Sequence, residues 1–256
     1  MSEQTLLELK GVSKNFGAVQ ALYKVDFRAI AGRVMALVGD NGAGKSTLIK
    51  GIAGIHTFNE GEIYFDGQPV TINSPRDCAD LGIEVVYQDL ALADNLDVVA
   101  NMFLGRERTK SLWRIDEVSM EGDCIKTLES LSVTTLQSVR QPVASLSGGQ
   151  RQAIAVAKAV MWNSRVVILD EPTAALGVAQ TRQVLDLVKR LADKGLAVVI
   201  ISHNLHDIFE VADYITVLRL GQQVGELVTA ETNQQEVVEA ITAGELTTVP
   251  GMAEEN

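Results

Sequence analysis

The sequence predicts an α/β protein in which a parallel sheet is packed between helices. Four short apolar segments alternate with segments of helical spacing, as in an αβα core built from crossover units. These segments are Val34–Val38, Glu84–Tyr87, Val166–Leu169 and Ala197–Ile201. Strand patterns are missing between residues 89 and 161, which predicts a helical subdomain inserted into this core.

A glycine-rich loop joins the first apolar segment to a predicted helix at Ser46–Ala53. Residues 39–47 fit the pattern G-x-x-x-x-G-K-[ST], in which glycines let successive N–H groups curl around phosphate oxygens. We expect Lys45 to reach the terminal phosphates of a nucleotide and the Ser46 hydroxyl to ligate Mg²⁺. The expected phosphate contacts are Gly39, Asp40, Asn41, Gly42, Ala43, Gly44, Lys45, Ser46 and Thr47.

Two carboxylates follow the third apolar segment. A strand that is apolar on both faces suits the centre of a parallel sheet, and ligands of such sheets collect at the carboxyl ends of the strands. We therefore expect Asp170 to hold Mg²⁺, directly or through water, and Glu171 to act as general base on an attacking water. Taken alone, the pair would more readily be interpreted as solvated acids that cap the turn before Pro172.

A helix start with two glycines precedes these carboxylates. Ser147 and Gln150 form a predicted capping box ahead of an alanine-rich helix over Ala153–Met161. Capping does not explain Gly148 and Gly149, because each glycine costs roughly 1 kcal/mol relative to alanine inside a helix. Since glycines leave backbone N–H groups open to an anion, Ser147, Gly148, Gly149 and Gln150 are expected to bind phosphate.

Local patterns predict the other elements. Three N-terminal strands, followed by a turn at Asp66-Gly67, are expected to form an antiparallel layer. Two helices of the subdomain should each begin with an Asp N-cap. The full set is strands Thr5–Lys10, Val25–Ala29 and Glu62–Asp66, helices Asp97–Leu104, Asp116–Leu131, Val178–Ala192 and Gln234–Thr242, a hairpin of Tyr214–Leu218 and Val224–Val228, and a frayed tail at Thr248–Asn256.

Length and composition set further limits. We expect residues 1–256 to form a single domain, with residues 1–88 and 162–256 as the core and residues 89–161 as the helical subdomain. The chain has 22 basic and 33 acidic residues and a formal net charge of −11. This balance argues against nucleic acid and against anionic lipid as direct partners.

Three features of the sequence indicate the cellular compartment in which the chain is expected to work. The longest apolar run, Leu196–Ile201, is too short to span a bilayer. Met1–Leu9 carries no basic region of the kind that opens a signal peptide. Cys78 and Cys124 are too few for a disulfide framework, and this fits a reducing compartment.

Taken together, the motifs resemble those of the ATPase subunits of ABC transporters, and the similarity runs from about Leu7 to Gly225. The phosphate-binding loop, the signature Ser147–Gln150 and the strand end at Asp170-Glu171 occur in the order of that family. The resemblance implies a P-loop NTPase (RecA-like) core with an antiparallel layer and an inserted helical subdomain. It also implies that ATP and Mg²⁺ are bound and that ATP is hydrolysed.

Weaker marks agree with the resemblance. Gln88 resembles the Q-loop glutamine that contacts Mg²⁺, His203 resembles the switch histidine that contacts the γ-phosphate, and Phe16 matches the aromatic residue that stacks on adenine. Each alone could be an ordinary surface, capping or core residue. One position departs from the family: Gly177 stands where the D-loop usually has an aspartate that helps to couple two ATP sites.

The residues 171–177 resemble the D-loop of monosaccharide importer ATPases. The resemblance therefore implies an importer subunit at the cytoplasmic face of the membrane. Its expected partners are a second copy of this chain, transmembrane permease subunits that contact the helical subdomain and, indirectly, a periplasmic or extracellular sugar-binding protein. The alternatives are an exporter ATPase, a non-transport ABC ATPase and a nucleotide-binding regulator without turnover.

Overall fold

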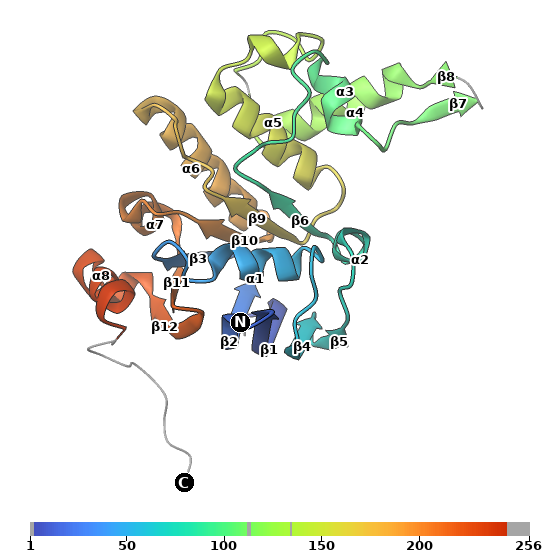
Figure 1. The fold of residues 1–256 in the computed structure, drawn as a ribbon. Helices are drawn as coiled ribbons and strands as arrows, with labels where there is room; N and C mark the ends of the chain where they lie inside the picture. Colours follow the sequence, from blue (N-terminus) through green and yellow to red (C-terminus); the bar gives the residue numbers. More distant parts are fainter. Residues whose placement is uncertain (1–2, 112–113, 134, 245–256) are drawn as a thin grey trace.

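A computed structural model describes residues 3–111, 114–133 and 135–244 of the chain, as two large sheets, a small hairpin and surrounding helices (Figure 1). The larger sheet has the order β12-β11-β3-β10-β9-β6, and only its β11–β12 pair is antiparallel. Its strands are β3 (Val34–Gly39), β6 (Ile83–Val86), β9 (Val166–Asp170), β10 (Ala197–Ile201), β11 (Tyr214–Arg219) and β12 (Gln222–Val228). The predicted parallel core is confirmed.

The second sheet is the expected antiparallel layer. Its order is β2-β1-β4-β5, with β1 (Thr5–Phe16), β2 (Val19–Ile30), β4 (Glu60–Phe65) and β5 (Gln68–Val70). The β1–β2 hairpin extends beyond the predicted strands because its outer end is solvent-exposed and lacks the apolar pattern used to predict strands. Backbone pairing still continues there, as far as Phe16 opposite Val19.

Eight helices surround the sheets in the described part of the chain. They are α1 (Lys45–Ile52), α2 (Pro75–Asp80), α3 (Val98–Phe103), α4 (Glu117–Ser130), α5 (Gly148–Val160), α6 (Val178–Asp193), α7 (Leu205–Val211) and α8 (Gln234–Ala243). The two predicted N-caps form: Asp97 accepts from the N–H of Ala100, and Asp116 accepts from that of Ser119. Short 3-10 turns cover Val143–Ser145 and Thr229–Glu231.

Some expectations need correction. Strands were not expected between residues 89 and 161, yet β7 (Thr109–Ser111) and β8 (Arg114–Ile115) form a small hairpin there. Thr109, Lys110, Arg114 and Ile115 of this hairpin are exposed, and the two strands are too short to produce an apolar alternation. The helices α2 and α7 were not predicted either. The tail at Thr248–Asn256 lies outside the described residues.

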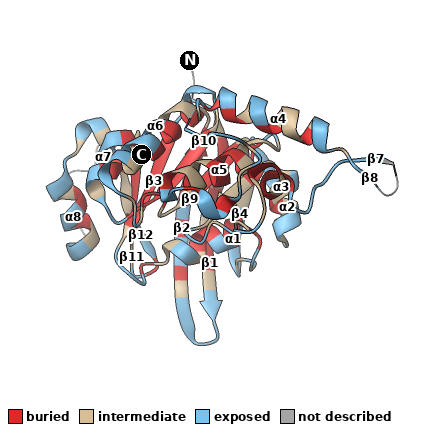
Figure 2. Cartoon of the chain, turned by 90° about the horizontal axis from the view of Figure 1, so that it is seen from above, coloured by how far each residue is buried: buried red, intermediate tan, exposed pale blue. Residues whose placement is uncertain are grey.

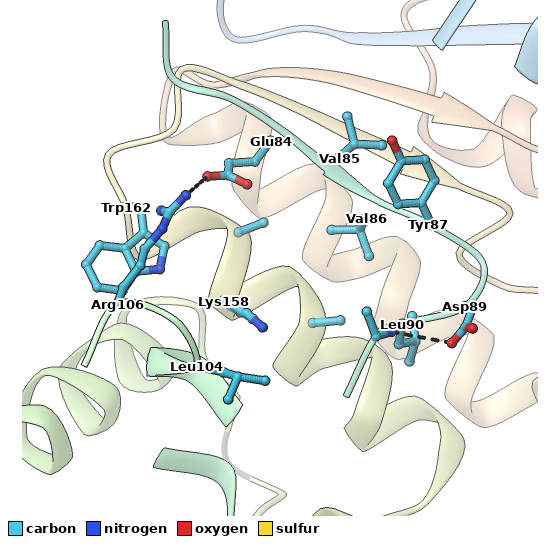
Figure 3. A pocket seen from close by; sticks show the side chains of 13 residues that line it. Glu84, Val85, Val86, Tyr87, Asp89, Leu90, Leu104, Arg106, Lys158 and Trp162 are labelled. Atoms are coloured by element: carbon cyan, nitrogen blue, oxygen red, sulfur yellow. Dashed lines mark hydrogen bonds and ion pairs between the residues drawn. The ribbon is translucent and has the colours of Figure 1, made fainter. Parts of the chain in front are cut away.

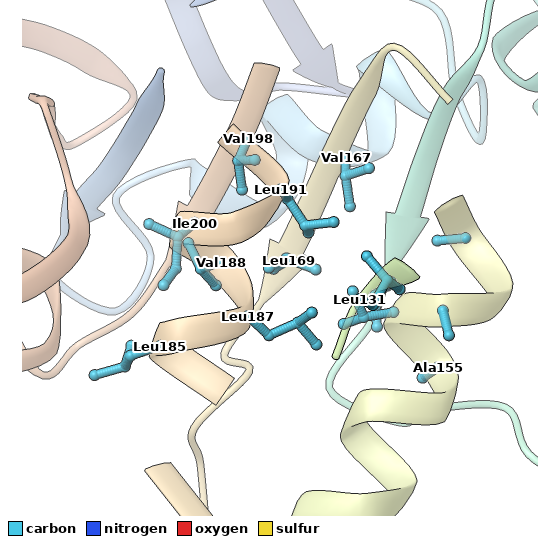
Figure 4. Close-up of a cluster of buried hydrophobic side chains, with 14 of the residues drawn as sticks. Leu131, Ala155, Val167, Leu169, Leu185, Leu187, Val188, Leu191, Val198 and Ile200 are labelled. Carbon is cyan, nitrogen blue, oxygen red and sulfur yellow. The ribbon is translucent and has the colours of Figure 1, made fainter. Parts of the chain in front are cut away.

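The parallel sheet separates two hydrophobic cores. Val167 and Leu169 of β9 face a core that includes residues of α5 and α6, as Figure 4 shows for the α6 side chains. Val166 and Ile168 face the opposite core, which includes residues of α1 and of the antiparallel layer. Figure 2 shows buried residues along the central strands and exposed ones over α4 and α8. The central strands are thus rigid supports for the loops at their carboxyl ends.

Candidate nucleotide site

The parallel register brings four predicted features to one edge of the sheet. Ile201, the last residue of β10, pairs with Leu37 of β3 on one side and with Asp170 of β9 on the other. The phosphate-binding loop, the two carboxylates and His203 therefore leave the sheet at the same level. Val86, the last residue of β6, pairs with Leu169 of β9, the residue before Asp170. Gln88 follows two positions after Val86, so Gln88 belongs to this edge as well.

Packing within the chain requires two glycines of the phosphate-binding loop. At Gly39, with φ of 153°, an added Cβ would lie 2.2 Å from the carbonyl oxygen of Leu218 in β11. At Gly44, with φ of 104°, it would lie 2.7 Å from a methyl carbon of Leu22 in β2. In contrast, no described atom lies within 4 Å of the corresponding position at Gly42. The loop is fixed at its two ends and open at its centre.

Lys45 folds back onto this loop. Its Nζ donates to the carbonyl oxygens of Gly39 at 2.7 Å and Asp40 at 3.0 Å. Burial lowers the pKa of Lys45, while the carboxylates of Glu171, Asp40 and Asp170 act in the opposite direction. The ammonium is thus held by weak neutral acceptors beside several negative charges, an arrangement in which phosphate oxygens could replace the two carbonyls.

Glu171 and His203 are in direct contact. The Oε2 atom of Glu171 lies 2.8 Å from Nδ1 of His203, and the side chains are 17% and 77% exposed, respectively. Glu171 has a φ of +51°, a left-handed conformation that costs roughly 1–2 kcal/mol outside glycine. Its N–H donates to the carbonyl of Ile201 at 2.9 Å. The two predicted catalytic residues therefore form a pair at the solvent boundary of the site.

Asp170 is half-buried behind this pair. Burial raises its pKa, the neighbouring Glu171 raises it further, and Lys45 and Lys50 oppose the shift. The two lysines only partly offset the cost of a negative charge on Asp170, so the approach of a further cation is favoured. The pKa of Tyr87 is raised first by burial, then by Cys78 and then by Asp170, so Tyr87 lies near the Asp170 carboxylate. Sequence reasoning singled out Gln88, which is exposed, and missed Tyr87 and Lys50.

Phe16 lies at the tip end of β1 with 51% of its surface exposed, so it is not a core residue. Its ring meets that of His56 edge-on, with centroids 5.4 Å apart. Lys14 holds its Nζ 5.1 Å from the Phe16 centroid and donates to the carbonyl of Thr57. A supported and exposed aromatic face of this kind suits stacking on a planar base. His56 was not predicted, because no local motif marks it.

The signature forms the predicted capping box. The N–H of Gln150 donates to Ser147 Oγ at 3.3 Å, and that of Ser147 donates to Gln150 Oε1 at 2.9 Å. The glycines, however, have neighbours in their own chain. An added Cβ would lie 2.9 Å from Leu176 at Gly148, and 3.0 Å from the Cβ of Gln180 at Gly149. Close packing against the D-loop and α6 is therefore one physical reason for these glycines.

The structure does not bring the signature to the phosphate-binding loop of the same chain. Figure 1 shows α5 beside α3 and α4, on the other side of the parallel sheet from the antiparallel layer. The hydrogen bonds described for the signature stay within the subdomain; for example, Gln150 Nε2 donates to the carbonyl of Thr135. The signature face of the chain is thus separate from its own nucleotide loop.

A buried hydrogen bond fixes Thr173 in the D-loop, whereas the space around Gly177 is open. Thr173 Oγ1 donates to a carboxylate oxygen of Asp207 at 2.7 Å, and both residues are buried. Ala175 has a φ of +60°. At Gly177, whose φ of −74° suits any residue, an added Cβ would meet no described atom within 4 Å. Neither backbone nor packing requires glycine at that position. Sequence reasoning missed the Thr173–Asp207 contact, which joins residues 34 positions apart.

Comparisons with known proteins agree with this arrangement. The family model described as "ABC transporter" matches residues 22–174. The chain is 46% identical over 230 residues to a fructose import ATP-binding protein of Rhizobium meliloti, covering 88% of each chain. It is also 46% identical over 238 residues to a xylose/arabinose import ATP-binding protein of Sulfolobus acidocaldarius, covering 93% of this chain and 94% of that one.

A solved structure, a nucleotide-free ATP-binding cassette from an ABC transporter, superposes with a TM-score of 0.79 at 27% identity, covering 88% of this chain and 91% of the other. No helix among the described residues is long and apolar enough to cross a membrane. The matching family model, the two close relatives and the shared fold show that this chain belongs to the ABC transporter family, as an ATP-binding subunit.

Proposed function

We propose that this chain binds and hydrolyses ATP to drive the import of a monosaccharide through a separate membrane permease. One observation carries the ATPase part: the phosphate-binding loop, Asp170 and the Glu171–His203 pair leave the parallel sheet at a single edge. The import part is supported by two relatives, each 46% identical and named for sugar import.

The nucleotide would lie across this edge. The N–H groups of residues 39–47 and the Lys45 ammonium would hold its phosphates, and Lys45 would exchange its two carbonyl partners for phosphate oxygens. Phe16 would stack on the base, since its ring is exposed and supported edge-on by His56. This assignment gives each part of ATP a contact of matching chemistry.

The residues also fit Mg²⁺. Among the described residues, no group of three His, Cys, Asp or Glu side chains could hold a metal by itself. Mg²⁺ does not require one, because it typically takes one or two carboxylates together with substrate phosphates and water. Asp170, the Ser46 hydroxyl and Gln88 would hold it, and the under-compensated charge of Asp170 supports this role. When bound, the ion would neutralise charge on the phosphates.

Glu171 is the proposed general base. Its carboxylate would accept a hydrogen bond from the attacking water and take up the water's proton as the bond to the γ-phosphorus forms. His203 touches the same carboxylate at 2.8 Å, so it can fix the orientation of Glu171 and donate toward the γ-phosphate. The left-handed backbone at Glu171 is consistent with a strained functional position.

We further propose that two copies of the chain form each closed site. The signature cannot serve its own phosphate-binding loop in this conformation, because α5 lies beyond the parallel sheet. The N–H groups of Ser147–Gln150 would instead close over ATP held by the second copy. The permease would bind the helical subdomain, which would keep the chain at the cytoplasmic face of the membrane, and the sugar-binding protein would act only through that permease.

Purification from detergent-solubilised membranes tests the proposal. The chain is expected to co-purify with a permease, and the complex in liposomes is expected to couple ATP hydrolysis to uptake of a monosaccharide supplied with its binding protein. A complex that moves substrate only outward would replace import with export. An ATPase that co-purifies with no membrane protein would contradict the transport assignment.

A further inference from the structure

His56 lies in the segment that leads from α1 to β4, and its ring packs between two phenylalanine rings. The ring centroid of His56 is 5.4 Å from that of Phe16 and 6.2 Å from that of Phe58, and both contacts are edge-on, with interplanar angles of 86° and 85°. Both distances fall in the range of about 4.5–7 Å that aromatic pairs prefer. Phe58, His56 and Phe16 thus form one continuous row of rings, which we call the aromatic row.

One end of the aromatic row is fixed to the helix that carries expected phosphate contacts. The ring of Phe58 lies directly over Gly51 of α1, because a Cβ added at Gly51 would lie 2.2 Å from Cζ of Phe58. The first turn of the same helix carries Lys45 and Ser46. The aromatic row therefore connects the phosphate-binding helix to Phe16, the residue proposed to stack on the base.

The other end of the row is the exposed tip of β1. Hydrogen bonds fix the backbone of β1 to the segment before β4: the N–H of Asn59 donates to the carbonyl of Ser13 at 2.8 Å, and the N–H of Asn15 donates to Oδ1 of Asn59 at 2.7 Å. These bonds hold the strand but do not orient the Phe16 ring. Within the described ranges, the ring of His56 is the only aromatic ring in contact with that of Phe16.

The imidazole of His56 is held by aromatic packing. Both of its nitrogens are buried, and neither has a hydrogen-bond partner among the described residues. Burial lowers the pKa of His56, and the Lys14 ammonium lowers it further. The backbone of Thr57 and of His56 itself acts in the opposite direction, and Lys50 adds a smaller lowering. Since the ordinary histidine value is 6.5, the ring is neutral near pH 7, and phenylalanine can reproduce its contacts.

We propose that His56 is a positioning residue for the nucleotide base, because it holds the Phe16 ring at a fixed separation from α1. This inference rests on the proposed function, which places the base on Phe16 and the phosphates at the loop before α1. A ring that is already oriented loses less freedom when the base stacks on it, so base and phosphates bind together at lower cost. His56 acts on the nucleotide through Phe16 and makes no contact with the reacting phosphates.

Calorimetric titration of the purified chain with two ligands tests the role of His56. The probes are ADP, which carries the base, and inorganic pyrophosphate, which lacks it, each with Mg²⁺. His56→Ala is expected to raise the Kd of ADP by about fivefold, the size of one aromatic contact. The same variant should keep the Kd of pyrophosphate within about twofold, because the phosphate-binding loop is unchanged.

Two further variants separate aromatic support from a general effect of substitution. His56→Phe should restore the Kd of ADP to within about twofold of the wild-type value, since it keeps a neutral ring in the aromatic row. His206→Ala is the matched control, because it makes the same substitution at an exposed histidine that has no aromatic contact in the described part of the chain. It should leave both dissociation constants unchanged.

A double-mutant cycle shows whether His56 acts through Phe16. In the background of Phe16→Ala, His56→Ala is expected to change the Kd of ADP by less than about twofold, because the ring that His56 supports is absent. Fully additive effects would mean that His56 acts independently of Phe16, and the inference would be wrong.

The remaining outcomes separate this inference from the proposed function. The inference is wrong, while ATP binding stands, if His56→Ala binds ADP as tightly as the wild type. It is equally wrong if His56→Ala weakens ADP and pyrophosphate to the same extent, or if His56→Phe fails to restore ADP binding. If the wild-type protein binds neither ADP nor pyrophosphate, the proposed nucleotide function is wrong as well.

Discussion

Gly149→Ala is the substitution that best separates two reasons for a glycine in the signature. One reason is ligand approach, and the other is packing within the chain. The added Cβ would lie 3.0 Å from the Cβ and 3.2 Å from the Cγ of Gln180 in α6. Carbon atoms pack best at about 3.5–4.0 Å, so these contacts are several tenths of an ångström too close. The Cβ of Gln180 cannot move without moving α6.

Two opposing contributions set the expected size. Alanine gains at most about 1 kcal/mol over glycine through helix propensity, and overpacking a well-packed site costs typically about 1–3 kcal/mol. Gly149→Ala is therefore expected to change stability by roughly zero to −2 kcal/mol. Gly122→Ala in α4 is the control, because no described atom lies within 4 Å of its added Cβ. That variant should gain about 1 kcal/mol.

Urea unfolding of the nucleotide-free proteins measures both variants by linear extrapolation. A double-mutant cycle with Gln180→Gly then isolates the contact, and a coupling of about 1–2 kcal/mol is expected. If Gly149→Ala instead stabilises the protein as much as Gly122→Ala does, and the coupling falls below about 0.5 kcal/mol, packing is not the reason. Ligand approach alone would then explain Gly149.

Two further predictions concern the nucleotide edge. Asp170→Asn should stabilise the nucleotide-free protein by about 0.5–1 kcal/mol near neutral pH, a figure kept small because the carboxyl is half-exposed. Since folding raises the pKa of Asp170, the ionised form costs stability above the ordinary aspartate value of 3.8. The gain should therefore disappear in thermal melts below that pH, and a gain that persists there would contradict the cause given. Phe16→Ala should raise the KM for ATP by roughly tenfold with little change in kcat, while Phe16→Tyr keeps the KM within about twofold; equal KM values for both variants would remove Phe16 from the site.

The parts of the site that are local in the sequence could be predicted from it. The phosphate-binding loop, the carboxylates Asp170 and Glu171 and the capping box at Ser147 each depend on residues a few positions apart. The loop and the two carboxylates meet at one edge because adjacent parallel strands end at the same side of the sheet, whereas the capping box lies apart from that edge. The family resemblance added Phe16, Gln88 and His203, which no local pattern distinguishes from ordinary residues.

Contacts between distant segments could not be predicted. Thr173 and Asp207 form a hydrogen bond across 34 positions, and Arg106 pairs with Glu84 across 22 positions (Figure 3). The interpretation of the signature glycines was incomplete for the same reason, since Gln180 belongs to a separate helix. The exposed end of the β1–β2 hairpin was missed because backbone pairing, not an apolar pattern, extends it to Phe16.

The central claim is that Glu171 activates water for the hydrolysis of ATP shared between two copies of the chain. Glu171→Gln tests it most directly, because glutamine keeps the shape of the side chain and removes the basic carboxylate. ATP turnover is measured together with the oligomeric state, by size exclusion with light scattering in ATP and Mg²⁺. The variant is expected to bind ATP, to lose about 100-fold or more of its hydrolysis and to accumulate as a dimer. Hydrolysis at the wild-type rate would contradict the assignment of the base, and an ATP-loaded variant that remains a monomer would contradict the shared site.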